Sequence, residues 1–225
     1  MSKNHLRQLI KQIVEAAFNT EYASSKSLAL LVENYPNSLR IVLYDPSSIL
    51  DFISDESEWL TAFNQYGDIA LNAIKATLDI DRHRGKCWDA GEVVASAAEK
   101  GYGPMMYEIG MSFCPGGLFA DRLSVSDSAK NVWKKFDQRS DVQKLHFDDI
   151  QFPRTPPKED DCKIVDDPIL NKAYKTRNQS DKTSLLANHK SFMSELSKSK
   201  INIRHVEHMI FRMAQVYFTI KYGNE

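Results

Sequence analysis

Residues 91–107 read GEVVASAAEKGYGPMMY, an apolar run followed by two glycines, Gly101 and Gly103, and then by helical spacing. Glycine lets the backbone approach a ligand closely and adopt conformations that other residues avoid. The first amides of a helix have no partner inside the helix and carry a partial positive charge. A glycine turn between a strand and a helix is therefore a candidate cradle for a phosphate or pyrophosphate. It is equally typical of a tight structural turn, and the sequence leaves both interpretations open.

The residues before this turn have the pattern of a β-hairpin. In residues 74–81 (IKATLDID) apolar and polar side chains alternate strictly, which predicts a half-buried strand of an antiparallel pair. The turn HRGK follows at 83–86, and residues 88–97 return as a second strand. Further upstream, residues 39–44 (LRIVLY) indicate a buried strand. The Asp-Pro pair at 45–46 suits the cap and first position of a short helix that runs to residue 53.

After the glycine turn the spacing of apolar residues becomes that of a helix. This helix ends at the breaker Pro-Gly-Gly, residues 115–117, and residues 118–121 then predict a short strand. Ser126 can cap a further helix. The buried face of that helix is expected to consist of Ala129, Val132, Trp133 and Phe136. Together these elements predict the α/β (α+β) class, with a mixed, mostly antiparallel sheet flanked by helices.

The chain divides into four parts by its pattern. Residues 1–34 are expected to be an N-terminal helical segment, because apolar side chains recur at helical spacing between residues 6 and 18. Residues 35–155 are expected to hold the α/β core. Residues 156–180, which begin within the proline-rich and acidic stretch FPRTPPKEDDC, are expected to be a linker. Residues 181–225 carry two helical stripes and predict a helical hairpin appended to the core.

Composition argues against several classes of protein. The chain has 225 residues, of which 42% are hydrophobic and 26% charged, and its formal net charge is −1. We therefore expect no nucleic-acid partner, since no net positive field draws a polyanion. No apolar run has the length needed to cross a bilayer, so we expect no membrane association. Cys87, Cys114 and Cys162 are far apart without CxxC spacing, which predicts three reduced thiols in a cytoplasmic protein and no metal site.

The order strand, strand, glycine turn, helix, strand, helix resembles the second half of the Gcn5-related N-acetyltransferase (GNAT) fold. In that family the acetyl-CoA loop follows Arg/Gln-x-x-Gly-x-Gly/Ala, and residues 98–103 here read AEKGYG. The family's next strand and helix carry N-x-x-A-x-x-x-Y, where this chain has VSDSAKNVWKKF with Ala129 followed by Trp133. The stretch from GYGPMMYEIGM to GGLFADRLSVSDSAKNVW also looks like acetyltransferase-like proteins encoded by tailed bacteriophages. The resemblance covers roughly residues 70–136.

The resemblance implies acetyl-CoA as co-substrate and an amine as acceptor. Glu92 would then be the general base that takes a proton from the attacking ammonium, a role that burial would help by raising its pKa. In the family the strands that correspond to residues 88–97 and 118–121 are parallel and splay apart, and the cofactor lies in the gap. A closed ladder between them would leave no site. Backbone groups of Val94, Ala95 and Ser96 would contact the pantetheine arm, and amides of Lys100, Gly101, Tyr102 and Gly103 would hold the pyrophosphate.

Two positions depart from the family pattern. Ala98 replaces the Arg or Gln, and Trp133 stands where many members have a tyrosine that protonates the leaving thiolate. An indole has no proton to give at neutral pH. The alternative is a non-catalytic phage protein on the same fold, either a virion component or a binder of a host factor, with the terminal helices as partner surfaces. If the chain is a phage-encoded enzyme, we expect it to act in the host cytoplasm. If it is a non-catalytic phage protein, the virion is a second expected location.

Overall fold

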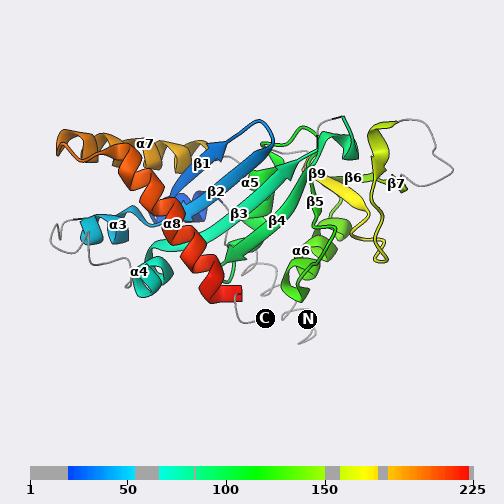
Figure 1. Ribbon diagram of the computed structural model, residues 1–225, viewed down its shortest axis with the longest axis horizontal. Coiled ribbons are helices and arrows are strands. Elements are labelled where there is room, and N and C mark those ends of the chain that lie inside the picture. The colour runs from blue at the N-terminus through cyan, green and yellow to red at the C-terminus, as the bar shows by residue number, and fades with distance from the viewer. Residues whose placement is uncertain (1–19, 54–65, 84, 150–157, 177–181, 223–225) are drawn as a thin grey trace, which may run out of the picture.

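The computed structural model describes residues 20–53, 66–83, 85–149, 158–176 and 182–222. These residues form a seven-stranded sheet with helices on both faces (Figure 1). Neighbouring strands are antiparallel, except that β4 and β5 run parallel. The prediction of a mixed, mostly antiparallel sheet flanked by helices is confirmed. The strand order is β1 (Ala29–Asn34), β2 (Ser38–Tyr44), β3 (Ile74–Arg82), β4 (Gly91–Ala98), β5 (Leu118–Ala120), β9 (Lys172–Thr176) and β6 (Val142–His146).

Two hydrophobic cores lie on opposite faces of this sheet. Helix α5 (Gly103–Met111) covers one face, and α6 (Asp127–Gln138) contributes to the same core. The other face is covered by α3 (Pro46–Ile53), α4 (Tyr66–Ala73) and α8 (Ile203–Tyr222), and α8 crosses it diagonally in Figure 1. The strands supply both cores by simple alternation, since successive side chains of a strand point to opposite faces. In β2, Leu43 packs in the α5 core and Val42 and Tyr44 pack in the α8 core.

The helix boundaries follow from local capping chemistry. Asp45 accepts a hydrogen bond from the backbone amide of Ser47 at 2.9 Å, and α3 begins between them at Pro46. Ser126 Oγ accepts from the amide of Ala129 at 3.3 Å and begins α6. Both caps were predicted from the sequence and are confirmed, as is the antiparallel β3–β4 hairpin.

The expected helical segment 1–34 is wrong over its last residues. A short helix, α2 (Thr20–Ser25), is followed by β1, which is the edge strand of the sheet and pairs with β2. The stretch ALLVEN is a short apolar run, and such a run cannot be assigned to helix or strand by periodicity alone. The amphipathic pattern at residues 6–18 lies outside the described residues.

The expected linker at 156–180 is also wrong in part. Residues of β9 lie inside the sheet between β5 and β6, and Tyr174 of β9 is fully buried against Trp133 with ring centroids 5.4 Å apart. The proline-rich stretch before β9 suggests a loop, and β9 is too short to produce a clear pattern of its own. The β9 part of this segment therefore belongs to the core and does not connect two units.

The two C-terminal helices are not an appendage. Helix α7 (Thr183–Lys198) runs along β1 next to α2, and α8 packs on β2, β3, β4 and α4. The buried face of α8 forms about a third of the second core. Among the described residues no helix is long and apolar enough to cross a membrane.

Cys87 and Cys162 form a disulfide, so the expectation of three reduced thiols is wrong for this pair. The bond joins the short 3-10 helix η2 (Cys87–Asp89), between β3 and β4, to β8 (Asp161–Cys162), which pairs with β7 (Asp148–Asp149). The two cysteines are 75 positions apart in the sequence and are brought together only by the fold. Cys114 is a buried free thiol.

Candidate functional site

Strands β4 and β5 separate halfway along β4. Their parallel ladder pairs Gly91 with Leu118 and ends where Val93 meets Ala120, while β4 continues to Ala98. At the same point the register with β3 shifts, because Asp79 faces Ala95 and Ile80 faces Val93. Val94 is therefore the extra residue of a β-bulge, a feature that bends a strand and is common beside functional sites. The second half of β4 has no partner strand on the β5 side.

A continuous groove follows this free half of β4. One hollow of about 180 Å³ lies by the glycine turn, and a second of about 200 Å³ lies by Val93 and Val94. The two hollows share four wall residues, so they are two halves of one groove. The shared residues are Ser96 of β4, Tyr107 of α5, Ala129 of α6 and Tyr222 of α8. Four separate elements therefore build the groove.

The glycine turn closes one end of the groove. Gly101 has φ 103°, a conformation that favours glycine, and Pro104 occupies the first turn of α5. A Cβ built on Gly103 would meet no atom within 4 Å, so the backbone there is open to the groove. Lys100, Gly101 and Gly103 line this end, as the sequence predicted. The amide of Tyr102 instead donates to the backbone carbonyl of Glu99 at 3.1 Å, and the Tyr102 side chain is in the core, so Tyr102 does not fit its predicted role.

Two hydroxyl groups meet in the middle of the groove. Ser96 Oγ lies 3.0 Å from the hydroxyl of Tyr107. Burial raises the pKa of Tyr107 to about 12, against the opposing effect of the Ser96 hydrogen bond, so the phenol stays protonated at neutral pH. Trp133 lies edge-on to Tyr107 at 4.9 Å and forms part of the wall at the far half of the groove.

Glu92 lies next to the far end of the groove and does not line either hollow. Its carboxylate is bonded to the ring of His83, Nε2 to Oε2 at 2.7 Å, and accepts from the backbone amide of Arg122 at 2.8 Å. Burial alone would raise its pKa, but the hydrogen bonds and charges of His83 and Arg122 outweigh burial and lower the pKa of Glu92. The raised pKa that would help the base role is therefore not present, and Glu92 is ionised at neutral pH.

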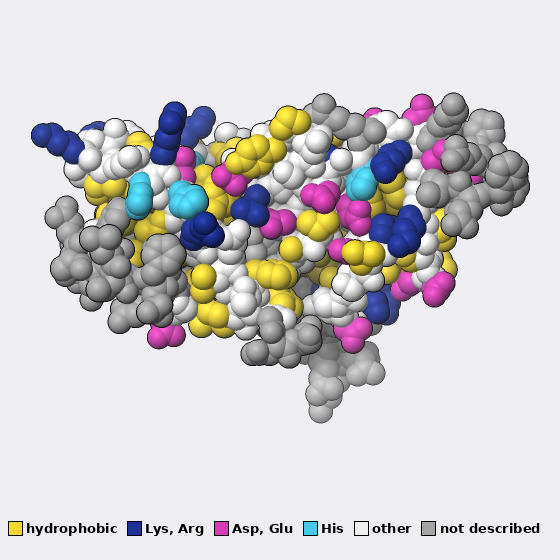
Figure 2. Space-filling model, viewed as in Figure 1, with side chains coloured by type: hydrophobic (Ala, Val, Ile, Leu, Met, Phe, Trp, Pro, Cys, Tyr) yellow, Lys and Arg dark blue, Asp and Glu magenta, His cyan; other side chains and the backbone are white. Residues whose placement is uncertain are grey.

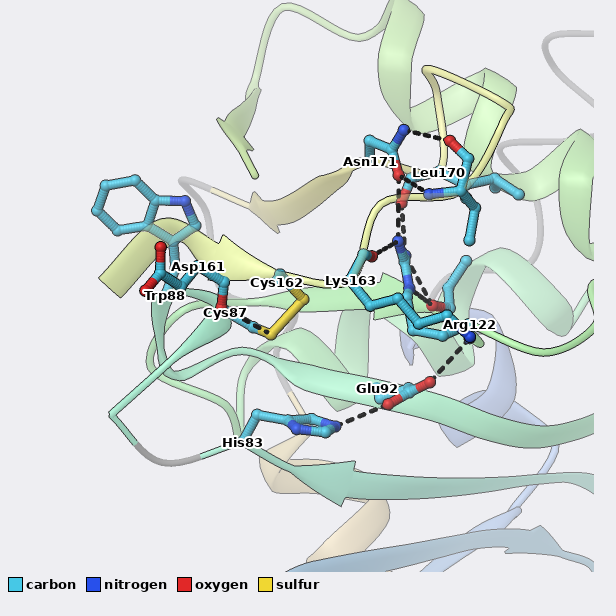
Figure 3. Close-up of a disulfide and its surroundings, with 12 residues drawn as sticks. His83, Cys87, Trp88, Glu92, Arg122, Asp161, Cys162, Lys163, Leu170 and Asn171 are labelled. Atoms are coloured by element: carbon cyan, nitrogen blue, oxygen red, sulfur yellow. Dashed lines mark hydrogen bonds and ion pairs between the residues drawn. A yellow bond between two sulfur atoms is a disulfide. The ribbon is translucent and has the colours of Figure 1, made fainter. Parts of the chain in front are cut away.

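Arg122 connects this end of the groove to the disulfide-bonded loop (Figure 3). Its guanidinium donates to the carbonyl oxygens of Ala120 at 2.8 Å, Leu170 at 2.5 Å and Lys163 at 3.3 Å. Burial lowers the pKa of Arg122 to about 10, which still leaves the group charged at neutral pH. The neighbouring Asp121 faces the groove, and its carboxylate accepts from the amide of Ser124 at 3.1 Å. The hydrogen bonds of Arg122 and Asp121 together fix the position of the loop that follows β5.

A third hollow begins where the groove ends. Val94 lines both the far half of the groove and a hollow of about 340 Å³ on the α8 face of the sheet. This third hollow is polar: Arg40 Nε is 2.9 Å from Asp79 Oδ1, and Glu33 and Asp81 also line it. Figure 2 shows Asp and Glu side chains gathered over the middle of this face. The hollow and the groove thus meet at the bulged residue of β4.

Of the residues predicted for the site, most lie together. Val94, Ala95 and Ser96 line the far half of the groove, and Lys100, Gly101 and Gly103 line the near half. Sequence patterns did not indicate Asp121, Phe218 or Tyr222 as wall residues, because they come from a short loop and from a distant helix. Within the described residues, no group of three or more His, Cys, Asp or Glu side chains is arranged to hold a metal ion.

Comparisons of the chain with family models, curated proteins and solved structures find no match. The residues assigned to this groove therefore come from its own geometry.

Proposed function

We propose that this chain is an acetyltransferase-like protein that binds acetyl-CoA in the groove beside β4 and transfers the acetyl group to an amine. The observation that carries the proposal is the separation of β4 from β5 beyond the bulge at Val94. It leaves a groove that begins at a helix N-terminus with open glycine backbone and ends at an exposed strand residue. The end at the helix N-terminus suits a phosphate, and the end at the exposed strand residue would hold the reacting group.

The groove suits the parts of acetyl-CoA in order. Backbone at Lys100, Gly101 and Gly103, at the start of α5, would hold the pyrophosphate. On the free edge of β4 the backbone amides and carbonyls of alternate residues in the stretch that includes Ala95 and Ser96 would bond an extended pantetheine arm as a neighbouring strand would. The bound molecule would supply an activated acetyl thioester at the Val94 end.

The acceptor would approach from the α8 face. Asp79 and Asp81 line the hollow that meets the groove at Val94, and such carboxylates favour a cationic amine over an anion. Glu92 is ionised and would take the proton from the ammonium through a water molecule, as a weaker base than an ordinary glutamate because His83 and Arg122 lower its pKa. Tyr107, kept protonated by burial, would donate a hydrogen bond to the sulfur that carries the departing charge.

A second function is supported by Trp133. Its ring is buried between Tyr107 and Tyr174 and has no proton to give, and Ala98 supplies no side-chain donor at the turn. A non-catalytic protein that keeps the CoA groove, or only its shape, is the alternative. Both versions retain the expectation of a phage-encoded chain acting in the host cytoplasm or in the virion.

Calorimetric titration with CoA and acetyl-CoA tests the proposal. We expect both to bind the wild type, and we expect Gly103→Leu to weaken binding at least about tenfold by filling the open space at the turn. Asn131→Leu places the same side chain on an exposed position of α6 that lines neither half of the groove, and it should bind like the wild type. Failure of the wild type to bind CoA, or equal binding by Gly103→Leu, contradicts the proposal. Binding without acetyl transfer to any amine supports the non-catalytic alternative.

A further inference from the structure

The last turns of α8 form one wall of the far half of the groove. Phe218 and Tyr222, four positions apart on one helix face, both line this half, and Tyr222 also lines the near half. Their rings pack together with centroids 5.6 Å apart. These two side chains come from a helix that lies outside the part of the chain resembling an acetyltransferase.

This wall is held firmly against the sheet. The preceding turns of α8 are buried in the second core through Met213, Ala214 and Tyr217, and α8 contacts β3 and β4 directly. The hydroxyl of Tyr217 also donates to the backbone carbonyl of Lys75 near the start of β3. In Figure 1 the C-terminal end of α8 lies beside β4. The backbone that carries Phe218 and Tyr222 is therefore anchored by the buried turns that precede it.

The opposite wall is equally fixed. Trp133 stacks on Tyr174 at 5.4 Å and meets Tyr107 edge-on at 4.9 Å, and all three rings are buried. Close-packed aromatic rings of this kind leave no space for an inserted chain. The far half of the groove is thus bounded by an aromatic wall on each side, within a volume of about 200 Å³.

Away from the glycine turn, this half continues past Val94 into a hollow lined by charged side chains. There the Arg40 guanidinium pairs with Asp79 at 2.9 Å and with Glu33 at 4.0 Å. An apolar chain that extended past Val94 would cover these charges and remove water from them, which is unfavourable. Beyond Val94 a longer acyl group would therefore meet charged side chains and no continuous apolar surface.

We propose that Phe218 and Tyr222 of α8 are specificity-determining residues that restrict the acyl group of the bound thioester to a short chain. The inference rests on the proposed function, because it takes the groove to bind CoA thioesters. It adds that the C-terminal helix, and not the glycine turn, selects among them.

Calorimetry with CoA, acetyl-CoA, butyryl-CoA and hexanoyl-CoA separates the two proposals. Burial of each added methylene in an apolar groove raises affinity about fourfold. The wild type should show no such increase from acetyl-CoA to hexanoyl-CoA, and its affinity should fall. Phe218→Ala and Tyr222→Ala should each restore at least about a tenfold gain for hexanoyl-CoA relative to acetyl-CoA. Ile220→Ala, an exposed position on the same turn that lines neither half, should behave like the wild type.

The outcomes are distinct. If the wild type gains affinity with chain length, or if both alanine variants keep the wild-type order of affinities, the assignment to Phe218 and Tyr222 is wrong while CoA binding stands. If CoA itself does not bind, the proposed function fails and this inference fails with it. Equal thermal midpoints of the wild type and the variants show that α8 remains docked.

Discussion

Tyr107 is the side chain on which the proposed chemistry depends most. It is buried, its hydroxyl meets Ser96 at 3.0 Å, and it lines both halves of the groove. Its raised pKa of about 12 makes it a poor source of a free proton and a dependable hydrogen-bond donor. A donor aimed at developing negative charge lowers the barrier without having to ionise.

Replacing Tyr107 with phenylalanine keeps the packed ring and removes this donor. We expect the rate of acetyl transfer to a small primary amine, followed by release of the CoA thiol, to fall about 10²-fold. The affinity for CoA should stay close to that of the wild type. Tyr102→Phe removes a hydroxyl from a neighbouring buried tyrosine that does not line the groove, and it should retain the wild-type rate. Equal rates for Tyr107→Phe and the wild type would show that the hydroxyl takes no part.

For Glu92, the sequence predicts where the residue lies but not which groups bond to its carboxylate. Its place on β4 beside the site follows from the strand pattern and the resemblance. Its partners do not, because His83 lies beyond a turn and Arg122 lies on the other side of a parallel crossover. The direction of its pKa shift depends on those partners, so burial alone does not determine it.

At the scale of elements, the sequence predicted those with a strong period or a clear cap. The alternating strand β3, the capped helices α3 and α6, and the two C-terminal helices all form as expected. The strands β1 and β9 were missed because a short run of five or six residues carries too little periodicity to identify its type. Only part of the groove was predicted from the sequence. The walls that β4 and α5 supply were predicted because these two elements are adjacent in the chain. The wall that α8 supplies was not, because it depends on packing between distant segments.

A half-buried histidine links three elements of the fold. His189 of α7 accepts at Nδ1 from the hydroxyl of Tyr44 of β2 at 2.9 Å, and its Nε2 lies 3.5 Å from Glu207 of α8. Burial lowers the pKa of His189, against the opposing attraction of Glu207. The folded protein therefore holds this ring neutral, with Nδ1 as the acceptor and Nε2 carrying the proton.

This arrangement predicts a loss of stability in mild acid. An unfolded histidine binds a proton below a pH of about 6.5, whereas His189 in the folded chain does so only at lower pH. The free energy of unfolding should therefore fall as the pH drops from 7.5 to 5.5. Urea denaturation at both values measures it. His189→Gln should show a smaller fall, and an equal fall in this variant would assign the pH dependence to other groups.

At the scale of the whole molecule, residues distant in sequence complete a single body around the groove. The segment after β6 returns to the sheet as β9, and its loop holds Arg122 through the carbonyls of Lys163 and Leu170. Arg122 in turn fixes the end of β5, where Asp121 faces the groove. The Cys87–Cys162 disulfide ties this same loop to the β3–β4 turn.

The disulfide should therefore stabilise the whole chain and not only its loop. A bond across a sequence separation of 75 residues restricts the unfolded ensemble, and reducing a bond of this kind costs about 2–4 kcal/mol of unfolding free energy. We expect dithiothreitol to lower the urea midpoint of the wild type by a corresponding amount. The double variant Cys87→Ser/Cys162→Ser should start at the lower midpoint and not respond, since Cys114 is already a free thiol. Thiol titration of the denatured, unreduced protein should find one reactive group. Three groups, with a midpoint that is independent of dithiothreitol, would show that the bond does not form.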